Sequence, residues 1–467
     1  MSEVRYGGKW TITSVEEKNE YDGQLTLDDK EGKIHLELYH FDLKREQMFA
    51  NSLIPKHIDS INGVLSNGAI ITLVDCTVYS RSAEVYYKNT ILLTAKYALN
   101  GVSIGVSEEA VFNKVSFELS YITDWADLNK FVTKYDEDDN FSLVYKGNSN
   151  ITIFEDEEKK IILEPNYRVE HGKDDREKIT LSKVVKVILE YDTSCTYEQA
   201  ITEVHKVANL VSFGTGNKVD IIKMEAFNIQ LNYIQIEKDV VEQPIEIFTS
   251  YTYKDSYPKG HSYFYLFTLR HLVTEYNNLA IKWFDNYDKL EPVIELYLDL
   301  YRYKMTHERA FLNIIQALET YHTRFKANNK KEYEKRVHEV VSSCPWYIKE
   351  QHLECLFGDG QRRARHVLLK GRLYDLFLTD FEIIFMSGYR MQYDFIKKAV
   401  ATRHYYTHYD EKKKDKIFTE DEIEESIYWL KTVLEYHLLK ELGLSQDYLQ
   451  NKIVQQRQHI ENIFGPY

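Results

Sequence analysis

Apolar and polar residues alternate with a period of two through the first half of the chain. The alternating runs are separated by short polar turns such as DDKEGK at residues 28–33, and they occupy residues 25–27, 34–38, 71–73, 115–121, 151–153 and 227–233. Runs of this kind are typical of an antiparallel sandwich or barrel. Residues 196–213 depart from the pattern, because their apolar side chains fall on one helical face. We therefore predict a β-rich region that contains one helix.

The apolar spacing changes to three and four after about Pro258. In residues 311–325 it has the period of an amphipathic helix, carried by Phe311, Ile314, Ile315, Leu318 and Phe325. Residues 367–378 and 381–409 continue the helical pattern. A final helix is predicted to start at Thr419, whose spacing to Glu422 matches a capping box. Four or five such helices would form a bundle.

The two patterns together predict an α+β protein. A β-rich, antiparallel sandwich- or barrel-like region is expected at residues 1–257, and an all-α region at residues 258–467. The length of 467 residues also favours at least two domains. The acidic stretch at residues 135–140 could divide the β-rich region into two subdomains, and the pattern alone leaves this open.

Composition narrows the class of protein. The formal net charge is −14, which argues against a protein that simply coats nucleic acid but leaves room for an RNA enzyme with locally gathered basic residues. The four cysteines are widely scattered, which indicates reduced thiols rather than a disulfide framework. The first residues lack the apolar core of a signal peptide, and no stretch has the roughly 18 apolar residues of a membrane helix. We expect a soluble, cytoplasmic protein without membrane partners.

The segment FIKKAVATRHYYTHYDEKKKDK, residues 395–416, carries the candidate chemistry. Arg403 follows the apolar positions Phe395 and Ala399 at helical spacing, so its guanidinium needs a partner. His404 and His408 are four residues apart and would share one helical face. Arg403 and His408 would be about 140° apart on a regular helix. For both to touch one phosphate, the helix must end nearby or a second subunit must contribute.

On these residues the sequence resembles a known family. Arg403 and His408 form the Arg-x4-His signature of HEPN ribonucleases. The longer string TRHYYTHYD at residues 402–410, together with FLNIIQALETYH at 311–322, is similar to the ApeA-type HEPN proteins of bacterial anti-phage defence. The resemblance covers roughly residues 300–445, and the β-rich region ahead of it matches the ApeA arrangement in outline. His404 departs from the family, where Asn or Asp often follows the arginine.

The resemblance implies an all-α HEPN bundle that cuts RNA without a metal or any other cofactor. A ribose 2′-hydroxyl would attack the adjacent phosphate, giving a 2′,3′-cyclic phosphate and a 5′-hydroxyl. Histidine exchanges protons near neutral pH, so His408 is assigned as general acid or base. Arg403 is assigned as the clamp on the phosphate and its transition state, with His404 orienting His408 or the phosphate. HEPN sites are typically composite across a homodimer, and Glu319 is a candidate partner that supports Arg403.

Basic residues suggest where the RNA backbone binds. The basic cluster with the fewest acidic residues among it is arginine-rich and comprises Arg362, Arg363, Arg365 and Arg372. A metal site at His404 and His408 is an alternative, because their spacing suits helical ligands, although the segment lacks the glutamate of a zincin motif. We expect no metal there.

By resemblance, the role is phage defence through abortive infection. The β-rich region would hold the nuclease in check until it senses infection, with a phage-derived protein as the trigger and transfer RNA or another abundant RNA as the substrate. A rival from another class is a non-catalytic HEPN dimerisation module, acting as a scaffold or an antitoxin-like partner. A third reading is a ligand-binding β-domain with a helical adaptor, which predicts indifference to changes at the motif.

Overall fold

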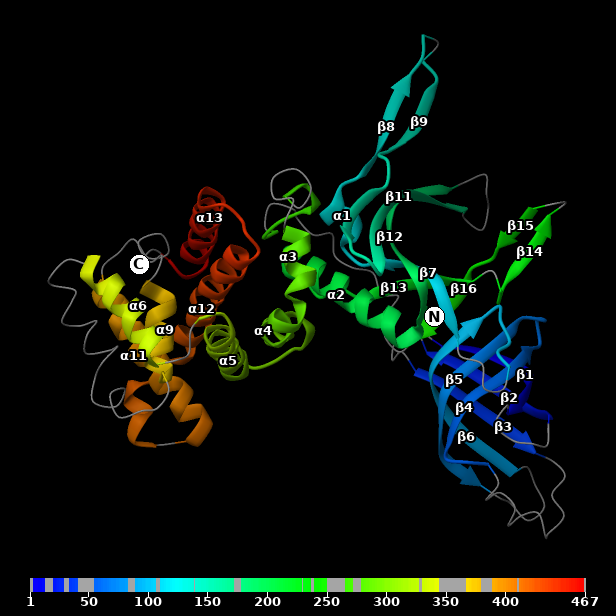
Figure 1. Cartoon of the computed structure of the whole chain (residues 1–467), viewed down its shortest axis with the longest axis horizontal. Helices are drawn as coiled ribbons and strands as arrows, with labels where there is room; N and C mark the ends of the chain where they lie inside the picture. The colour runs from blue at the N-terminus through cyan, green and yellow to red at the C-terminus, as the bar shows by residue number, and fades with distance from the viewer. Residues whose placement is uncertain are drawn as a thin grey trace. The chain divides into compact units, whose positions relative to one another are not determined.

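A computed structural model of the chain shows two compact units (Figure 1). It describes residues 3–12, 20–28, 33–40, 54–82, 89–105, 110–137, 139–171, 178–228, 230–236, 239–249, 265–271, 279–326, 330–343, 367–378, 389–409 and 411–465. One unit comprises residues 1–211 and 219–263, and the other comprises residues 212–218 and 264–467. The first is β-rich and the second is helical, which confirms the predicted fold class. The predicted boundary between residues 257 and 258 lies outside the described residues.

The first six strands of the β-rich unit close into an antiparallel barrel. They are β1 (Glu3–Ile12), β2 (Glu20–Asp28), β3 (Lys33–His40), β4 (His57–Leu65), β5 (Ile70–Ser82) and β6 (Asn89–Asn100). Their order is β6-β3-β2-β1-β4-β5, and a further pairing of β5 with β6 completes the ring. Inward-facing residues fill its interior: Leu25, Leu36 and Leu73 come from the predicted alternating runs, and Trp10, Ile61 and Leu93 come from strands outside those runs. The period of two therefore predicted β2, β3 and β5 correctly.

Strand β6 also begins a second group of strands. One edge of β6 pairs with β3 over residues 89–94 and with β16 over residues 97–100. The order from there is β16 (Ile245–Thr249), β13 (Ile221–Phe227), β7 (Val111–Leu119), β12 (Ile179–Thr196), β11 (Lys159–His171) and β10 (Ile151–Glu155). Because β6 divides its hydrogen bonds between two neighbours, the barrel and this extension form one continuous sheet.

The predicted helix of the β-rich region is α2 (Tyr197–Thr215). Its start is fixed by reciprocal bonds: the Thr196 hydroxyl accepts from the Gln199 backbone N–H (3.3 Å), and the Gln199 side chain accepts from the Thr196 backbone N–H (2.9 Å). The predicted apolar face is buried, with Ala200, Val204, Val207, Ala208 and Val211. The helix ends before Gly216, whose φ of 64° is a conformation that glycine adopts without strain.

The structure corrects the prediction for residues 227–233 and shows what the acidic stretch at residues 135–140 connects. The alternating run at residues 227–233 is not one strand. The chain turns at Asn228, whose carbonyl and side chain accept from the backbone N–H groups of Leu231 and Gln230, and β14 (Tyr233–Ile236) then pairs with β15 (Asp239–Glu242). The acidic stretch at residues 135–140 runs from the last residue of β8 (Asn129–Tyr135) to the start of β9 (Phe141–Gly147), and because these two strands pair, the stretch connects neighbouring strands of one hairpin.

An added methyl group at Gly63 in the barrel is expected to be costly. A Cβ atom at Gly63 would overlap the indole ring of Trp10. Gly63→Ala is therefore expected to lower the free energy of unfolding of the β-rich unit by about 1–3 kcal/mol, because overpacking displaces neighbours. Gly7→Ala is the matched control, since a Cβ atom there meets nothing within 4 Å. Urea unfolding followed by tryptophan fluorescence measures both, and equal effects of the two changes would contradict the prediction.

The second unit is helical, as predicted, and α5, α9, α11 and α12 correspond to predicted helices. In chain order, the helices among its described residues are α3 (Leu279–Asp285), α4 (Tyr287–Arg302), α5 (His307–Phe325), α6 (Lys330–Ser343), α9 (Leu369–Leu378), α11 (Tyr389–His408), the 3-10 helix η4 (Glu411–Lys416), α12 (Glu420–Glu441) and α13 (Gln446–Phe464). The capping box of Thr419 and Glu422 at the start of α12 is confirmed. The helix that starts at Thr419 is not the last, because α13 follows it. None of the helices in the described ranges is long and apolar enough to span a membrane.

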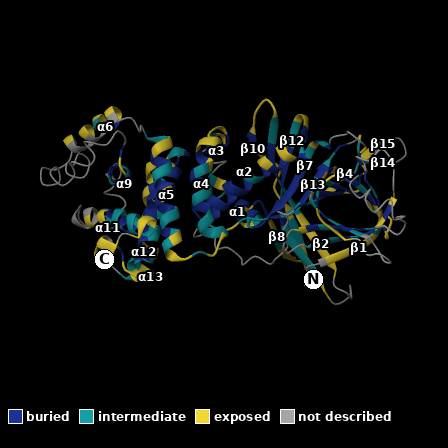
Figure 2. Ribbon diagram, turned by 90° about the horizontal axis from the view of Figure 1, so that it is seen from below, coloured by how far each residue is buried: buried dark blue, intermediate teal, exposed yellow. Residues whose placement is uncertain are grey.

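The core of the helical unit lies between α4, α5 and α12. Figure 2 shows buried residues along α4 and α5. Phe213, Trp283 and Tyr297 pack as an aromatic cluster at one end of this core. Helix α12 is buried on most sides and carries the buried carboxylate of Glu435, which accepts hydrogen bonds from Tyr297 and Gln456. A buried carboxylate needs such donors, so this network fixes α12 between its neighbours.

Candidate active site

The two histidines of the motif lie at the C-terminal end of α11. His408 is the last residue of this helix, and Tyr409 follows with a φ of 51°, a left-handed conformation that ends the helical hydrogen bonding. The rings of His404 and His408 are 4.8 Å apart, as their spacing of four residues predicts. His408 is exposed, whereas His404 is half-buried and its Nδ1 has no hydrogen-bond partner among the described residues. An exposed imidazole at a helix end is available for proton exchange with a ligand.

Buried residues of α11 hold the motif against the rest of the bundle. Ala399 and Thr402 are fully buried. The Thr402 hydroxyl accepts a hydrogen bond from the backbone N–H of Phe418 (2.9 Å), just ahead of α12. This bond fixes the helical turn that precedes Arg403.

Arg403 extends from α11 toward α5. Its Nη2 lies 3.5 Å from Oε2 of Glu319, and the two side chains are 35% and 22% exposed. The pair is thus accessible to solvent, and its stabilising effect is small. A guanidinium held by one carboxylate keeps other donors for a ligand, since arginine has five N–H groups.

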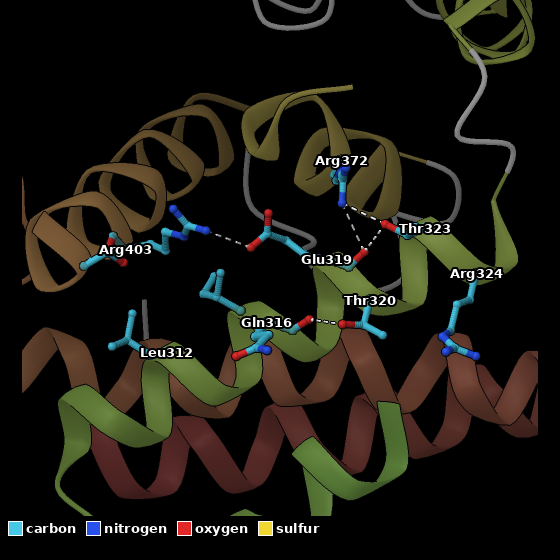
Figure 3. Close-up of a pocket in the computed structure, with 10 residues that line it drawn as sticks. Leu312, Gln316, Glu319, Thr320, Thr323, Arg324, Arg372 and Arg403 are labelled. Carbon is cyan, nitrogen blue, oxygen red and sulfur yellow. Dashed lines mark hydrogen bonds and ion pairs between the residues drawn. The ribbon is translucent and has the colours of Figure 1, made fainter. Parts of the chain in front are cut away.

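Arg403 lines a pocket with a volume of about 550 Å³ (Figure 3). Helix α5 supplies most of its wall, α9 supplies one arginine, and α11 supplies Arg403 and Thr407. The full lining is Leu312, Ile315, Gln316, Glu319, Thr320, Thr323, Arg324, Arg372, Arg403 and Thr407. His404 and His408 do not line it. One chain therefore places Arg403 in the pocket and His408 outside it, as the predicted angle of about 140° requires.

Of the arginine-rich cluster predicted from the sequence, only Arg372 lies among the described residues. Arg362, Arg363 and Arg365 lie outside the described residues. Arg372, on α9, is in the pocket and donates from Nε to the carbonyl of Val367 (2.9 Å) and from Nη1 to the hydroxyl of Thr323 (2.8 Å). The sequence had placed Arg372 among backbone-binding residues without a link to the Arg403 site, and the fold brings the two into one pocket.

The polar residues of α5 were not singled out from the sequence. Gln316, Thr320, Thr323 and Arg324 recur at spacings of one helical turn on the side opposite the apolar face. That spacing was the available signal, but a polar stripe on a helix is also the mark of an ordinary solvated face.

A tyrosine of the motif stays protonated. Burial raises the pKa of the Tyr406 hydroxyl, and the negative charges of Glu308 and Glu420 raise it further. Tyr406 is therefore a neutral hydroxyl at physiological pH and a poor candidate for a general base. For a metal site at His404 and His408, the described part of the chain offers no third ligand, because it contains no group of three or more His, Cys, Asp or Glu side chains placed to hold an ion.

Two family models match the chain. The one described as ApeA N-terminal domain 1 matches residues 5–283, more than half of the chain, and the one described as Apea-like HEPN matches residues 312–448. The first match runs through the β-rich unit and into α3. The second runs from α5 into α13 and contains the whole motif around Arg403 and His408. No curated protein and no solved structure matches the chain.

Proposed function

Because this chain belongs to the ApeA-type HEPN anti-phage proteins, we propose that it is a metal-independent endoribonuclease that acts in abortive infection. The helical unit cuts cellular RNA, with transfer RNA as one abundant target. The β-rich region restrains the nuclease and releases it when it senses infection, through a phage-derived protein as the trigger. The net charge of −14 supports this division, because it disfavours indiscriminate binding of RNA by the resting protein.

One observation carries the proposal: a single helix presents an accessible arginine in a pocket and an exposed histidine at its C-terminal end. His408 takes the proton of the attacking 2′-hydroxyl or returns one to the leaving 5′-oxygen. Arg403 stabilises the negative charge that develops on the phosphorane oxygens. Glu319 limits the rotamers of Arg403, so that the guanidinium is oriented before the phosphate arrives.

The active site is completed by a second copy of the chain. Arg403 lies in the pocket and His408 lies outside it, so the two groups of one chain do not converge on one phosphate. A two-fold axis near the ends of two α11 helices brings the His408 of one copy toward the Arg403 of the other. A homodimer of this kind supplies both groups to each site.

Purified full-length protein on total bacterial RNA in EDTA tests the proposal. The expected result is a set of cut RNAs whose 3′ ends carry a 2′,3′-cyclic phosphate and whose 5′ ends are hydroxyls, because the nucleophile is internal to the RNA. A metal-dependent hydrolase would instead lose activity in EDTA. Since a trigger can be required, the same protein is also expressed in cells under phage infection. Failure to cut RNA in both settings would leave the non-catalytic scaffold as the better reading.

A further inference from the structure

The pocket beside Arg403 carries more positive charge than the proposed chemistry uses. Three guanidinium groups line it, from Arg324, Arg372 and Arg403, against one carboxylate, from Glu319. That carboxylate is paired with Arg403. Among the described residues, Arg324 and Arg372 bond only to neutral groups, with Arg324 donating to the backbone carbonyl of Asp288 (3.1 Å). Two positive charges in this recess thus have no acidic partner among the residues that the structure describes.

Arg372 is held in one orientation by three contacts. Its Nε donates to the Val367 carbonyl (2.9 Å), and its Nη1 donates to the Thr323 hydroxyl (2.8 Å) and to the Glu319 carbonyl (3.4 Å). No described residue accepts from Nη2, whose two N–H groups remain for a ligand. A guanidinium fixed in this way loses little entropy when it binds an oxyanion, and it binds phosphate in a planar geometry.

Glu319 connects the two arginines. Its side chain contacts Arg403, and its backbone carbonyl accepts from Arg372 (Figure 3). The two guanidinium groups therefore flank a single residue of α5, one on its carboxylate side and one on its backbone side. Glu319 and Thr323 are one helical turn apart, about 6 Å along the axis. Arg403 and Arg372 thus reach the same short stretch of α5, so a ligand that spans this stretch can meet both guanidinium groups.

We propose that Arg372, oriented by Thr323 and assisted by Arg324, binds the phosphodiester next to the one held at Arg403. The inference rests on the proposed ribonuclease function and adds a second phosphate subsite to it. Its ligand is a single RNA strand that crosses the pocket along α5. The pocket thus recognises two consecutive phosphates, and the charge at the flanking linkage determines how tightly the strand is held.

Binding of an uncleavable strand tests the subsite without relying on catalysis. The probe is a labelled 2′-O-methyl pentanucleotide, and a set of variants carries one uncharged methylphosphonate at each linkage in turn. With the full-length wild type, neutralising one linkage beside the Arg403 position is expected to weaken binding about 10-fold. This is the effect expected from the loss of one charge-assisted hydrogen-bonded pair, roughly 10-fold in affinity. Arg372→Gln is expected to weaken binding of the unmodified strand by a similar factor and to abolish the sensitivity at that linkage.

Two further changes separate a direct contact from a folding defect. Thr323→Val removes the hydroxyl that orients Arg372 at an exposed position and is expected to weaken binding about threefold while the thermal melt stays unchanged. Arg309→Gln is the matched control, because Arg309 is an exposed arginine of the same helix, outside the pocket. It is about 21 Å from Thr323 along the axis. The slope of log affinity against log salt is expected to fall by about 0.7 for Arg372→Gln and to stay constant for the control.

The outcomes separate the subsite from the nuclease. If wild type cuts RNA but Arg372→Gln keeps its affinity and its linkage sensitivity, the subsite is wrong and the proposed function stands. If the strand binds through Arg372 but RNA is never cut, the subsite stands and the nuclease fails. Absence of strand binding by wild type overturns the subsite. Tighter Arg372-dependent binding of ATP than of the pentanucleotide would assign the pocket to a free nucleotide instead of RNA.

Discussion

Replacement of His408 by alanine is expected to abolish RNA cleavage, with a loss of about 10²–10⁴-fold in rate, the range that general acid–base groups contribute. Arg403→Ala is expected to cost about 10²–10³-fold, because the developing charge on the phosphate loses its fixed cation. Both changes lie at accessible positions of α11, so the fold is expected to be unaffected. The measurement is the initial rate on RNA in EDTA, together with growth arrest when each protein is expressed during infection.

His307→Ala and Arg309→Gln are the matched controls, since both residues are exposed in the first turn of α5 and neither lines the pocket. Near wild-type rates are expected for both. Cleavage by His408→Ala at the wild-type rate would remove His408 from the mechanism.

A mixture of the two inactive proteins adds a test of the composite site. In a dimer of one His408→Ala chain and one Arg403→Ala chain, one of the two sites keeps both groups. Random exchange of subunits is therefore expected to recover about a quarter of wild-type activity. No recovery, after subunit exchange has been verified, would favour a site built within one chain.

Replacement of Asp375 by alanine is expected to destabilise the bundle by about 3 kcal/mol. Asp375 on α9 and His322 on α5 form a buried pair, with Oδ2 and Nε2 2.6 Å apart and exposed fractions of 4% and 0%. Removing Asp375 takes this hydrogen bond away from a fully buried imidazole, and losing a buried hydrogen bond of this kind is costly. The pair also joins the helix that carries Arg372 to the helix that carries Glu319, so pocket geometry depends on it.

Amide hydrogen exchange of the full-length protein measures this effect, because it reports the opening free energy of each segment. Faster exchange is expected in peptides of α5 and α9, with the β-rich unit unchanged. Asp375→Asn is the conservative control, since an amide oxygen can still accept from His322. Unaltered exchange in α9 after Asp375→Ala would show that the pair contributes nothing to holding the two helices together.

The sequence by itself determined those features that depend on neighbours within a few turns. The helical period defined α5, α12 and the faces of α11, because side chains three and four residues apart share a face wherever a helix forms. The capping box at Thr419 was readable for the same reason. The motif around Arg403 and His408 lies within one helix, so its internal geometry followed from spacing alone. A sparse apolar pattern, with only Leu449, Ile453 and Ile460 buried, left α13 unrecognised.

The tertiary structure alone decided which distant segments meet. The closing pairing of β5 with β6, the sharing of the other edge of β6 between β3 and β16, and the turn at Asn228 depend on which hydrogen bonds form in three dimensions, and alternation fits each outcome equally well. Glu319 and Arg403 are 84 residues apart, and Arg372 reaches α5 from a third helix. Such contacts arise only when amphipathic faces are buried against one another. The period of a helix specifies the face that packs, and packing against the rest of the molecule specifies its partner.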